Sequence, residues 1–421
     1  MGLVVASLGG LLGSCGVGEP GDVRGPSRAA AWGASTEGGR GGRILRVSTL
    51  ASAGRGSLRA AVEAEGRRVV VFEVGGVIDL EGWSIRAREP YLTIAGETAP
   101  SPGVTVLRGG LRIETHDVVA RHLRIRPGEA GHGKRSGWEV DAITVAGREA
   151  HDVVVEHCSL SWATDENLTA TGPQFAGQTP TEWRRGTSRR ITFRNNIVAE
   201  GLSESTHGEG EHSKGTLIYE NVTEVTITGN LYAHNMKRNP YFKGGTRGVV
   251  ANNVIYNAGR KAVQYALGAR AWDGRPYEED RLAVVGNVMK LGPNTTPGLP
   301  LVSIDGVGPV ELFVEDNLVL DRLGRAVEAP LIVRDDDRLA REAAGRFWSE
   351  DVALLTAAQV FDQVLGKAGA RPWDRDEVDQ RIIQEVRDGA GRIIDSEEEV
   401  GGYPRHDSTH RPFEAETWNH K

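Results

Sequence analysis

The chain has 421 residues, with 50 Lys or Arg against 57 Asp or Glu, so its formal net charge at pH 7 is −7. This length allows a large core within one long domain, and the mild negative charge makes the chain a poor candidate for nonspecific nucleic-acid binding. The 55 glycines, against 18 prolines, fit a chain that is rich in tight turns.

Residues 1–15 form an apolar run that ends in small residues before Cys15. The run is too short to span a bilayer and is typical of an export signal, although the positively charged start of a signal peptide is missing. The segment Leu12-Gly-Ser-Cys15 resembles the cleavage box of a bacterial lipoprotein, which would leave Cys15 lipidated. We therefore expect a secreted protein or an outer-membrane lipoprotein, with residues 16–40 as a linker. Cys158 would then remain as a single thiol without a disulfide partner, buried as a small hydrophobic side chain.

A short helix is expected over residues 57–66. Ser57 is a favourable N-cap, the following Ala, Leu and Glu residues favour a helix, and Gly66 is a stop signal. The helix precedes the strand-rich part of the chain. It is placed to cover the N-terminal end of that part.

One short motif recurs along the strand-rich part: an asparagine directly precedes a short apolar strand. It occurs at Asn196, Asn230, Asn253, Asn287 and Asn317. The separations of 23 to 34 residues indicate stacked repeats. The stretches are rich in Val, Ile and Thr and too short for helices, which favours half-buried strands. Two earlier rungs carry histidine at the asparagine position, His122 and His157.

Coils stacked in this way predict an all-β solenoid, a parallel β-helix over residues 41–345. Asparagine tolerates the left-handed backbone of a sharp bend, and its amide can bond to the asparagine of the next rung. The alternative is a β-sandwich with unrelated turns. Such turns need not repeat one residue before the same apolar pair.

The C-terminal part shows helical spacing in two segments, at Leu354, Ala358, Phe361 and Leu365 and again at Val378, Ile382 and Val386. We expect residues 346–421 to form a helical extension with an irregular tail from Ser396, packed on the cylinder.

Acidic residues gather before two neighbouring strands, at Glu139, Asp141, Asp165 and Glu166. Residues two apart on a strand face the same side, and stacking brings the next rung alongside, so these carboxylates can converge. Calcium takes six to eight oxygen ligands and would relieve their repulsion. The alternative is a solvated acidic face, because charged residues are normally exposed.

Basic and histidine residues follow on later coils and should line the same flank as the acids: His207, His212, Lys214, Lys237, Arg238 and Lys243. A metal ion beside fixed cations suits a polymer of carboxylates. The two histidines could suggest zinc, but their spacing lacks the usual motif and no cysteines accompany them. They are expected to line a groove.

Several segments resemble those of the pectate lyases. Asp141-Ala-Ile-Thr-Val and Val154-Val-Glu-His-Cys-Ser-Leu-Ser are similar to the family segments DAITI and WIDHCSLS, and Asp165 resembles the aspartate of its ADG segment. Lys214 resembles the lysine that precedes an apolar strand, and Arg238-Asn-Pro-Tyr-Phe-Lys243 resembles the signature RxPxxR. The resemblance runs from about residue 41 to about residue 265.

The resemblance implies a right-handed parallel β-helix and calcium-dependent β-elimination of polygalacturonate. It implies Arg238 as the base and Lys214 and Lys243 as groups that hold substrate carboxylates. We further expect Lys237 and His212 to contact substrate in the same groove. The implied calcium ligands are Glu139, Asp141 and Asp165, with Glu166, Asn167 or substrate completing the set.

Two positions depart from the family pattern. Lys243 replaces the final arginine of the signature, which exchanges a bidentate fork for a point charge. Thr169 stands where the family often has a further carboxylate ligand.

The function expected from the sequence is that of a secreted, monomeric lyase of an acidic plant cell-wall polysaccharide. Three alternatives remain at this point: a calcium-independent lyase of methyl-esterified pectin, a noncatalytic polysaccharide-binding β-helix, and a glycoside hydrolase that uses two carboxylates.

Overall fold

The computed structural model describes residues 32–277, 280–334, 340–348 and 352–415. The predictions of an export signal and of lipidation at Cys15 fall outside these residues. No helix in the described ranges is both long and apolar enough to cross a membrane.

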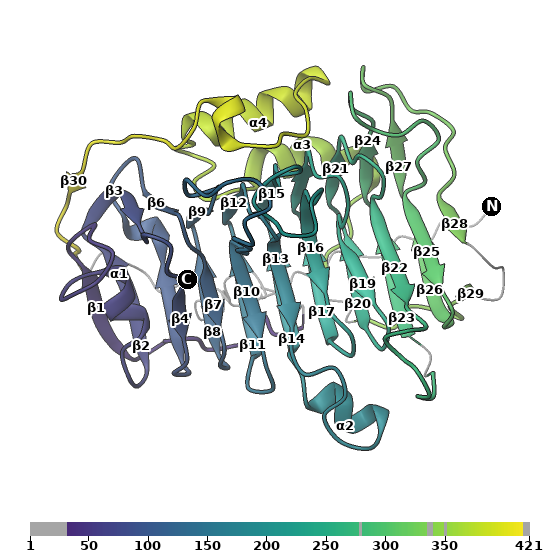
Figure 1. Cartoon of the computed structure of the whole chain (residues 1–421), viewed down its shortest axis with the longest axis horizontal. Helices are drawn as coiled ribbons and strands as arrows, with labels where there is room; N and C mark the ends of the chain where they lie inside the picture. The colour runs from purple at the N-terminus through teal and green to yellow at the C-terminus, as the bar shows by residue number, and fades with distance from the viewer. Residues whose placement is uncertain (1–31, 278–279, 335–339, 349–351, 416–421) are drawn as a thin grey trace, which may run out of the picture.

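The described strands coil into three sheets that run along the whole body (Figure 1). Neighbouring strands within each sheet are parallel, except where the C-terminal tail pairs antiparallel with the third sheet. The predicted parallel β-helix is confirmed.

The first sheet contains, in spatial order, β1 (Arg43–Val47), β2 (Arg68–Phe72), β5 (Leu92–Ala95), β8 (Val118–Arg121), β11 (His151–Glu156), β14 (Arg189–Arg194), β17 (Thr223–Thr228), β20 (Arg247–Ala251), β23 (Asp280–Val285), β26 (Val310–Glu315) and β29 (Ala340–Glu342). The second sheet contains β4 (Ile85–Ala87), β7 (Leu111–Ile113), β10 (Ile143–Ala146), β13 (Glu166–Thr171), β16 (Lys214–Ile218), β19 (Tyr241–Lys243), β22 (Val263–Leu267), β25 (Val302–Gly306) and β28 (Ile332–Arg334). The third contains β30 (Thr409–His410), β3 (Val74–Asp79), β6 (Val104–Leu107), β9 (Arg124–Arg126), β12 (Ser159–Ser161), β15 (Ile197–Ala199), β18 (Leu231–Ala233), β21 (Val254–Tyr256), β24 (Val288–Lys290) and β27 (Leu318–Leu320).

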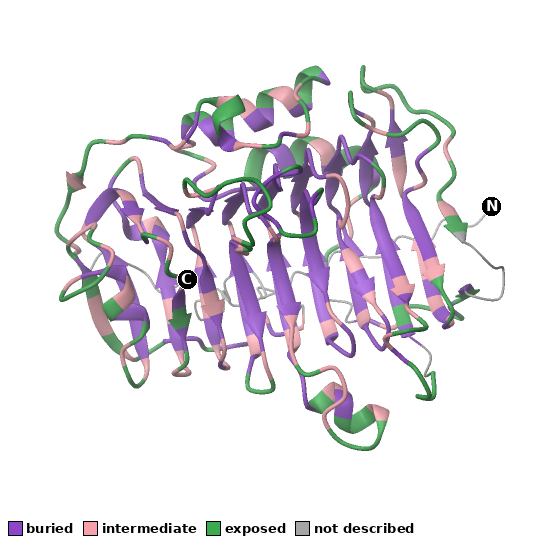
Figure 2. Ribbon diagram, in the orientation of Figure 1, coloured by how far each residue is buried: buried purple, intermediate pink, exposed green. Residues whose placement is uncertain are grey.

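Inward side chains of the three sheets form one continuous apolar core. Figure 2 shows the strands as mostly buried and the connecting loops as mostly exposed. Cys158 lies in this core with no exposed surface, and burial raises the pKa of its thiol to about 12. The thiol is therefore a small apolar side chain at neutral pH, as predicted.

The recurring asparagines form a hydrogen-bonded ladder, as the sequence predicted. Asn196 donates from its backbone N–H and from its side-chain amide to Oδ1 of Asn230, both at 2.9 Å. The same two bonds link Asn230 to Asn253, Asn253 to Asn287 and Asn287 to Asn317. The ladder satisfies the buried amides and fixes how each rung sits on the next.

The prediction that histidine occupies the ladder position in two earlier rungs is wrong by one residue. Oδ1 of Asn196 accepts a hydrogen bond of 2.8 Å from the backbone N–H of Cys158, so Cys158 holds the ladder position and His157 precedes it. His157 and His122 adopt left-handed backbone angles, with φ of 49° and 57°, and their rings stack with centroids 4.9 Å apart. The corner that needs the left-handed conformation is therefore the residue before the ladder, occupied later by Asn195.

The N-terminal helix α1 (Leu58–Val62) is present and shorter than expected. Ser57 caps it, since its Oγ accepts a hydrogen bond from the backbone N–H of Ala60 at 3.2 Å. Leu58, Ala61 and Val62 are buried in the main core. The helix ends four residues before Gly66, so Gly66 is a turn residue before β2 and not a helix cap.

The short helix η1 (Gly96–Thr98) connects β5 to β6 within the coil. The other described helices are α2 (Pro180–Arg185), α3 (Ala357–Lys367), α4 (Glu377–Asp388) and η3 (Glu397–Val400). Helices α3 and α4 confirm the predicted helical segments, and they run along one side of the cylinder in Figure 1. Their buried residues pack against the outer residues of the third sheet. The guanidinium of Arg126 in β9 reaches Asp376 at 2.6 Å and Asp379 at 3.0 Å, so an internal ion cluster ties α4 to the coil. The extension thus lies against the third sheet, away from the outer face of the second.

We expect Asn253→Ala to lower the free energy of unfolding by about 1 to 3 kcal/mol, because buried partners on both neighbouring rungs lose hydrogen bonds. Chemical denaturation measures this loss. Asn317→Ala is the matched control: Asn317 is partly exposed, so water replaces its bonds and the loss is smaller. An unchanged stability of Asn253→Ala would contradict a structural role for the ladder.

Candidate active site

The predicted acids and cations meet at the starts of three neighbouring strands of the second sheet. Glu166 of β13 pairs in register with Lys214 of β16, and Lys214 forms a bridge with Lys237, just before β19. Paired strands lie about 4.8 Å apart, so residues distant in the sequence come within reach of one another. We call Asp141, Asp165, Glu166, Lys214 and Arg238 the site column.

Three carboxylates of the column converge. Asp141, Asp165 and Glu166 each offer an oxygen, and these oxygens lie within 4.8 Å of one another. Oδ1 of Asp141 accepts a bond of 2.9 Å from the backbone N–H of Glu166, and Oδ2 accepts one of 2.8 Å from the hydroxyl of Thr144. Burial, together with the negative charge of Asp165, raises the pKa of Asp141 to about 7. An all-oxygen set with crowded negative charge fits Ca²⁺ better than a softer metal.

Asp165 is held by histidine. Its Oδ1 lies 2.9 Å from Nε2 of His212 and 3.8 Å from Nε2 of His207, and the two rings are stacked. Burial alone would raise the pKa of Asp165, but the hydrogen bond and charge of His212 lower it below its ordinary value. Asp165 therefore keeps its negative charge at neutral pH, while Asp141 titrates near neutrality.

The same histidines, with Asp165, form a second group of possible metal ligands. Nζ of Lys214 lies 3.0 Å from Nδ1 of His212. An ammonium group already stands against these nitrogens and repels a metal ion there. The oxygen group of Asp141, Asp165 and Glu166 is the better cation site.

The two cations of the column are both partly removed from water. The guanidinium of Arg238 forms an ion pair with the carboxylate of Glu166 and is 22% exposed. Burial lowers the pKa of Arg238, although Asp165 and Asp141 oppose the shift. Burial also lowers the pKa of Lys214 to about 8. Both groups thus lose a proton more readily than an exposed cation would.

Glu139 lies at the edge of the site and outside the carboxylate trio. Residues 139–141 precede β10 and are not part of a strand, so the expected strand alternation does not apply to Glu139 and Asp141. Oε1 of Glu139 accepts a bond of 3.0 Å from the backbone N–H of Gly208 and lies 3.7 Å from Nε2 of His207. A calcium-ligand role for Glu139 stays a prediction, without the support that the structure gives to the trio.

Lys243 is placed further along the sheet than the rest. It ends β19, whereas Arg238 precedes the turn at residues 239–240 that leads into this strand. Its Nζ pairs with Oε1 of Glu220 at 2.6 Å and lies 4.3 Å from the centre of the Tyr219 ring. Glu220 neutralises this cation, and nothing in the sequence around Lys243 indicated that partner. Lys237 is half-buried, and its charge contributes, after burial, to lowering the pKa of Lys214.

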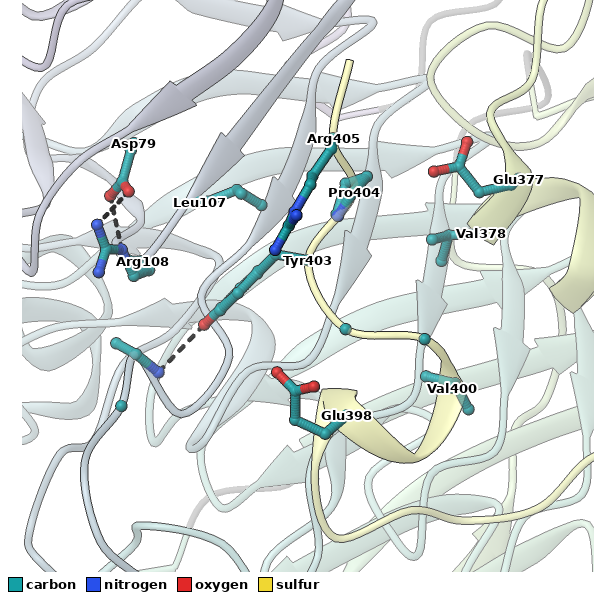
Figure 3. A pocket seen from close by; sticks show the side chains of 14 residues that line it. Asp79, Leu107, Arg108, Glu377, Val378, Glu398, Val400, Tyr403, Pro404 and Arg405 are labelled. Carbon is teal, nitrogen blue, oxygen red and sulfur yellow. Dashed lines mark hydrogen bonds and ion pairs between the residues drawn. The ribbon is translucent and has the colours of Figure 1, made fainter.

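A cavity of about 640 Å³ lies elsewhere, between the loops of the third sheet and the C-terminal tail (Figure 3). Asp79 and Arg108 form an ion pair at one side of it, and the hydroxyl of Tyr403 accepts a bond of 3.1 Å from the backbone N–H of Ala130. Its lining contains none of the predicted site residues. Thr144, which sequence reasoning missed, belongs to the site instead. It follows Asp141 by three residues, a spacing at which a hydroxyl can bond to an Asp side chain.

No protein-family model matches the chain. Among curated relatives, "Probable pectate lyase C" of Aspergillus terreus is 32% identical over 380 residues, which are 89% of this chain and 80% of that protein. The protein of the same name from Aspergillus fumigatus (strain Af293) is 34% identical over 380 residues, with the same coverage of 89% and 80%.

Two solved structures share the fold. The cedar-pollen allergen jun a 1 gives a TM-score of 0.53 at 16% identity, covering 80% of this chain and 92% of that one. A pectate lyase variant of Bacillus subtilis gives 0.52 at 13% identity, covering 82% and 97%. At these identities the likeness concerns the fold alone.

We expect the calcium affinity of the protein to fall as the pH is lowered through about 7, the pKa of Asp141. Below that pH the free protein holds a proton on Asp141 that must leave before the carboxylate can serve as a ligand. Isothermal titration calorimetry in buffers of different ionisation heat measures both the affinity and the protons released. Asp141→Asn should bind calcium more weakly and lose this pH dependence. Equal affinity and no proton release on either side of neutrality would contradict the assignment.

Proposed function

Because the chain belongs to the pectate lyase family, we propose that it cleaves polygalacturonate by calcium-dependent β-elimination at the site column. Membership in this family makes the chain a polysaccharide lyase. One observation supports the finer proposal: three carboxylates converge beside Arg238 and Lys214 on neighbouring rungs. A cation-binding trio next to fixed positive charges suits a substrate with a carboxylate on every sugar unit.

Calcium is the cofactor that the donor set fits, with Asp141, Asp165 and Glu166 as the residues that would hold it. A bound calcium ion would neutralise a uronate carboxylate and so make the proton on the adjacent C5 more acidic. A neutral methyl ester would gain less from this arrangement, which disfavours a pectin lyase.

Arg238 is the proposed base that accepts the C5 proton. A guanidinium is ordinarily too basic for this role, because it keeps its proton at neutral pH. Burial shifts the pKa of Arg238 in the required direction. Glu166 is the ion-pair partner of Arg238. If Glu166 bound another group instead, Arg238 would lose a contact that stabilises its charged form.

Lys214 is the proposed holder of the substrate carboxylate. Its ammonium is largely buried beside Asp165 and His212, and it points to the same column as Arg238. Lys237 lies on the next rung and adds positive charge. Lys243 could contact only a more distant sugar unit, and its pairing with Glu220 weakens that role.

The products of elimination at C4 and C5 are 4,5-unsaturated oligogalacturonides. Secretion is part of the proposal, because a cell-wall polymer is too large to reach an enzyme inside the cell. A monomeric state and a lipid anchor at Cys15 stay predictions.

With polygalacturonate and calcium, the protein should form a product that absorbs in the ultraviolet, since elimination creates a double bond conjugated to the carboxylate. A chelator should stop the reaction and added calcium should restore it. Arg238→Lys should keep the charge but lose most of kcat, because a lysine presents its nitrogen differently to C5. Arg260→Lys, on the following loop and 48% exposed, is the matched control and should keep normal turnover. Near-normal kcat in Arg238→Lys would show that the base lies elsewhere, and full activity in chelator would remove the calcium requirement.

Thr169→Asp should lower the calcium concentration needed for half-maximal activity without a matching gain in kcat. Thr169 is 3% exposed and sits on β13 in register with Thr144, the residue that bonds to Asp141. A carboxylate there adds a charged oxygen beside the trio, and calcium affinity rises with ligand charge. Thr169→Asn, which has the shape without the charge, should not show the effect. Unchanged calcium dependence in Thr169→Asp would place this side chain away from the ion.

A further inference from the structure

Three arginines gather around one glutamate on the outer face of the second sheet. Oε1 of Glu114 lies 2.5 Å from Nη2 of Arg86 and 2.8 Å from Nε of Arg112. Oε2 lies 3.1 Å from Nε of Arg86 and 3.3 Å from Nε of Arg88. We call these four residues the arginine cluster.

The cluster is strongly positive. Three guanidinium groups share a single carboxylate, so two positive charges remain unbalanced. Hydrogen bonds from Arg86 and Arg112 hold the pKa of Glu114 at about 2, so the carboxylate is charged throughout the neutral range. The next acid, Glu63, approaches the backbone N–H of Arg86 and pairs with Arg59 at 3.4 Å. It does not cancel the excess.

The positive groups face solvent while their shared acid does not. The side chains of Arg86, Arg88 and Arg112 are 45%, 65% and 40% exposed, against 19% for Glu114. Each guanidinium has five N–H donors, and Glu114 occupies only one or two of them. The remaining donors are oriented by Glu114 and open to an anion, and a guanidinium fork matches the two oxygens of a carboxylate.

The cluster lies beyond the site column along the axis of the cylinder, on the row that contains Thr144, three residues further along the chain than Asp141. Arg86 of β4 pairs in register with Arg112 of β7, which pairs with Thr144 of β10, which pairs with Thr169 of β13. Thr144 bonds to Asp141 of the column. At about 4.8 Å per strand, Arg112 is about 5 Å and Arg86 about 10 Å along the axis from Thr144. Figure 1 shows β4, β7, β10 and β13 side by side on one face.

A hollow connects the cluster with the neighbouring rungs. A cavity of about 480 Å³ is lined by residues at the ends of β7, β10 and β13 and in the loops that follow, among them Arg112, Glu114, Arg148 and Thr171. Arg148 and Glu149 are both exposed at its rim, so together they add no net charge. The cavity lies at the ends of these strands, whereas the site column lies at their starts, so a chain of sugars reaches the arginine cluster by crossing the second sheet obliquely.

We propose that the arginine cluster is a further substrate-binding subsite, which binds carboxylates of galacturonate units several sugars away from the cleaved bond. The assignment of the substrate class rests on the proposed lyase function. The cluster makes affinity depend on substrate length: a long chain reaches both the column and the arginines, whereas a short one bound at the column does not. Its contribution appears in KM and not in kcat, because these groups are remote from the reacting atoms.

The test is the double variant Arg86→Gln/Arg112→Gln, assayed with polygalacturonate and with trigalacturonate. For the polymer at low salt we expect KM to rise by about three- to tenfold with kcat unchanged, the size of effect that two exposed ion pairs produce. For the trimer both parameters should be unchanged. The difference should shrink at high salt, because screening removes interactions between exposed charges.

The matched control is Arg190→Gln/Arg281→Gln on β14 and β23 of the first sheet. These arginines are 38% and 44% exposed and each pairs with one acid, Asp152 and Glu311. This variant loses the same net charge and should leave KM for the polymer unchanged. A second variant, Glu114→Gln, makes the cluster more positive by one charge and should lower KM for the polymer at low salt.

Equilibrium binding of long and short oligogalacturonates, measured by calorimetry, separates this proposal from the lyase function. If the unmodified protein bound the long oligomer more tightly and the double variant did not, the subsite would stand even without lyase activity. If the double variant and the control had the same affinity for the long oligomer, or if long and short substrates were weakened equally, the subsite would be refuted. That result would leave the cleavage mechanism untouched.

Discussion

The fixed stacking of one rung on the next is the constraint on which the rest of the structure depends. The functional side chains described above come from several neighbouring coils, and the groups meet only because the strands pair in one register. A slip of one residue would turn each strand's outer side chains into the core. The asparagine ladder opposes such a slip, because each Oδ1 accepts two buried hydrogen bonds from the rung before. The ladder lies at the corner before the third sheet, so it occupies none of the positions of the site column on the second sheet.

Burial shifts the pKa values of the acids and of the cations of the site in opposite directions, and both shifts favour the uncharged form of the group. It raises the pKa of Asp141 and lowers the pKa values of Lys214 and Arg238, so both kinds of group are brought towards their neutral forms. Asp165 keeps its charge because His212 stabilises it. Without ligands, the site thus holds groups close to their neutral forms, and a divalent cation and a polyanion would bring the charges that these groups bind. The arginine cluster differs, because its guanidinium groups are exposed and charged and can attract an anion through the solvent.

The features that repeat could be predicted from the sequence, and those that depend on a partner from another coil could not. The ladder, the capping helix and the convergence of three acids follow from local pattern and spacing. His122 and His157 were misplaced because both positions before the strand are asparagine in two later rungs, at residues 195–196 and 252–253, and the strand pairing shows which one carries the ladder. The strand alternation expected for Glu139 and Asp141 is absent because the loop before β10 is not extended strand. Lys243 looked available because its partner Glu220 comes from another coil, and the arginine cluster was invisible for the same reason.

The central claim, that catalysis occurs at the site column with calcium on its carboxylates, is tested most directly by a crystal structure. The Arg238→Lys protein, soaked with calcium and a galacturonate oligomer, should bind both without consuming the substrate. The account predicts an anomalous scattering peak among Asp141, Asp165 and Glu166, with a uronate carboxylate next to it and C5 facing position 238. A calcium ion bound away from this trio, or an oligomer lying on another face of the cylinder, would contradict it.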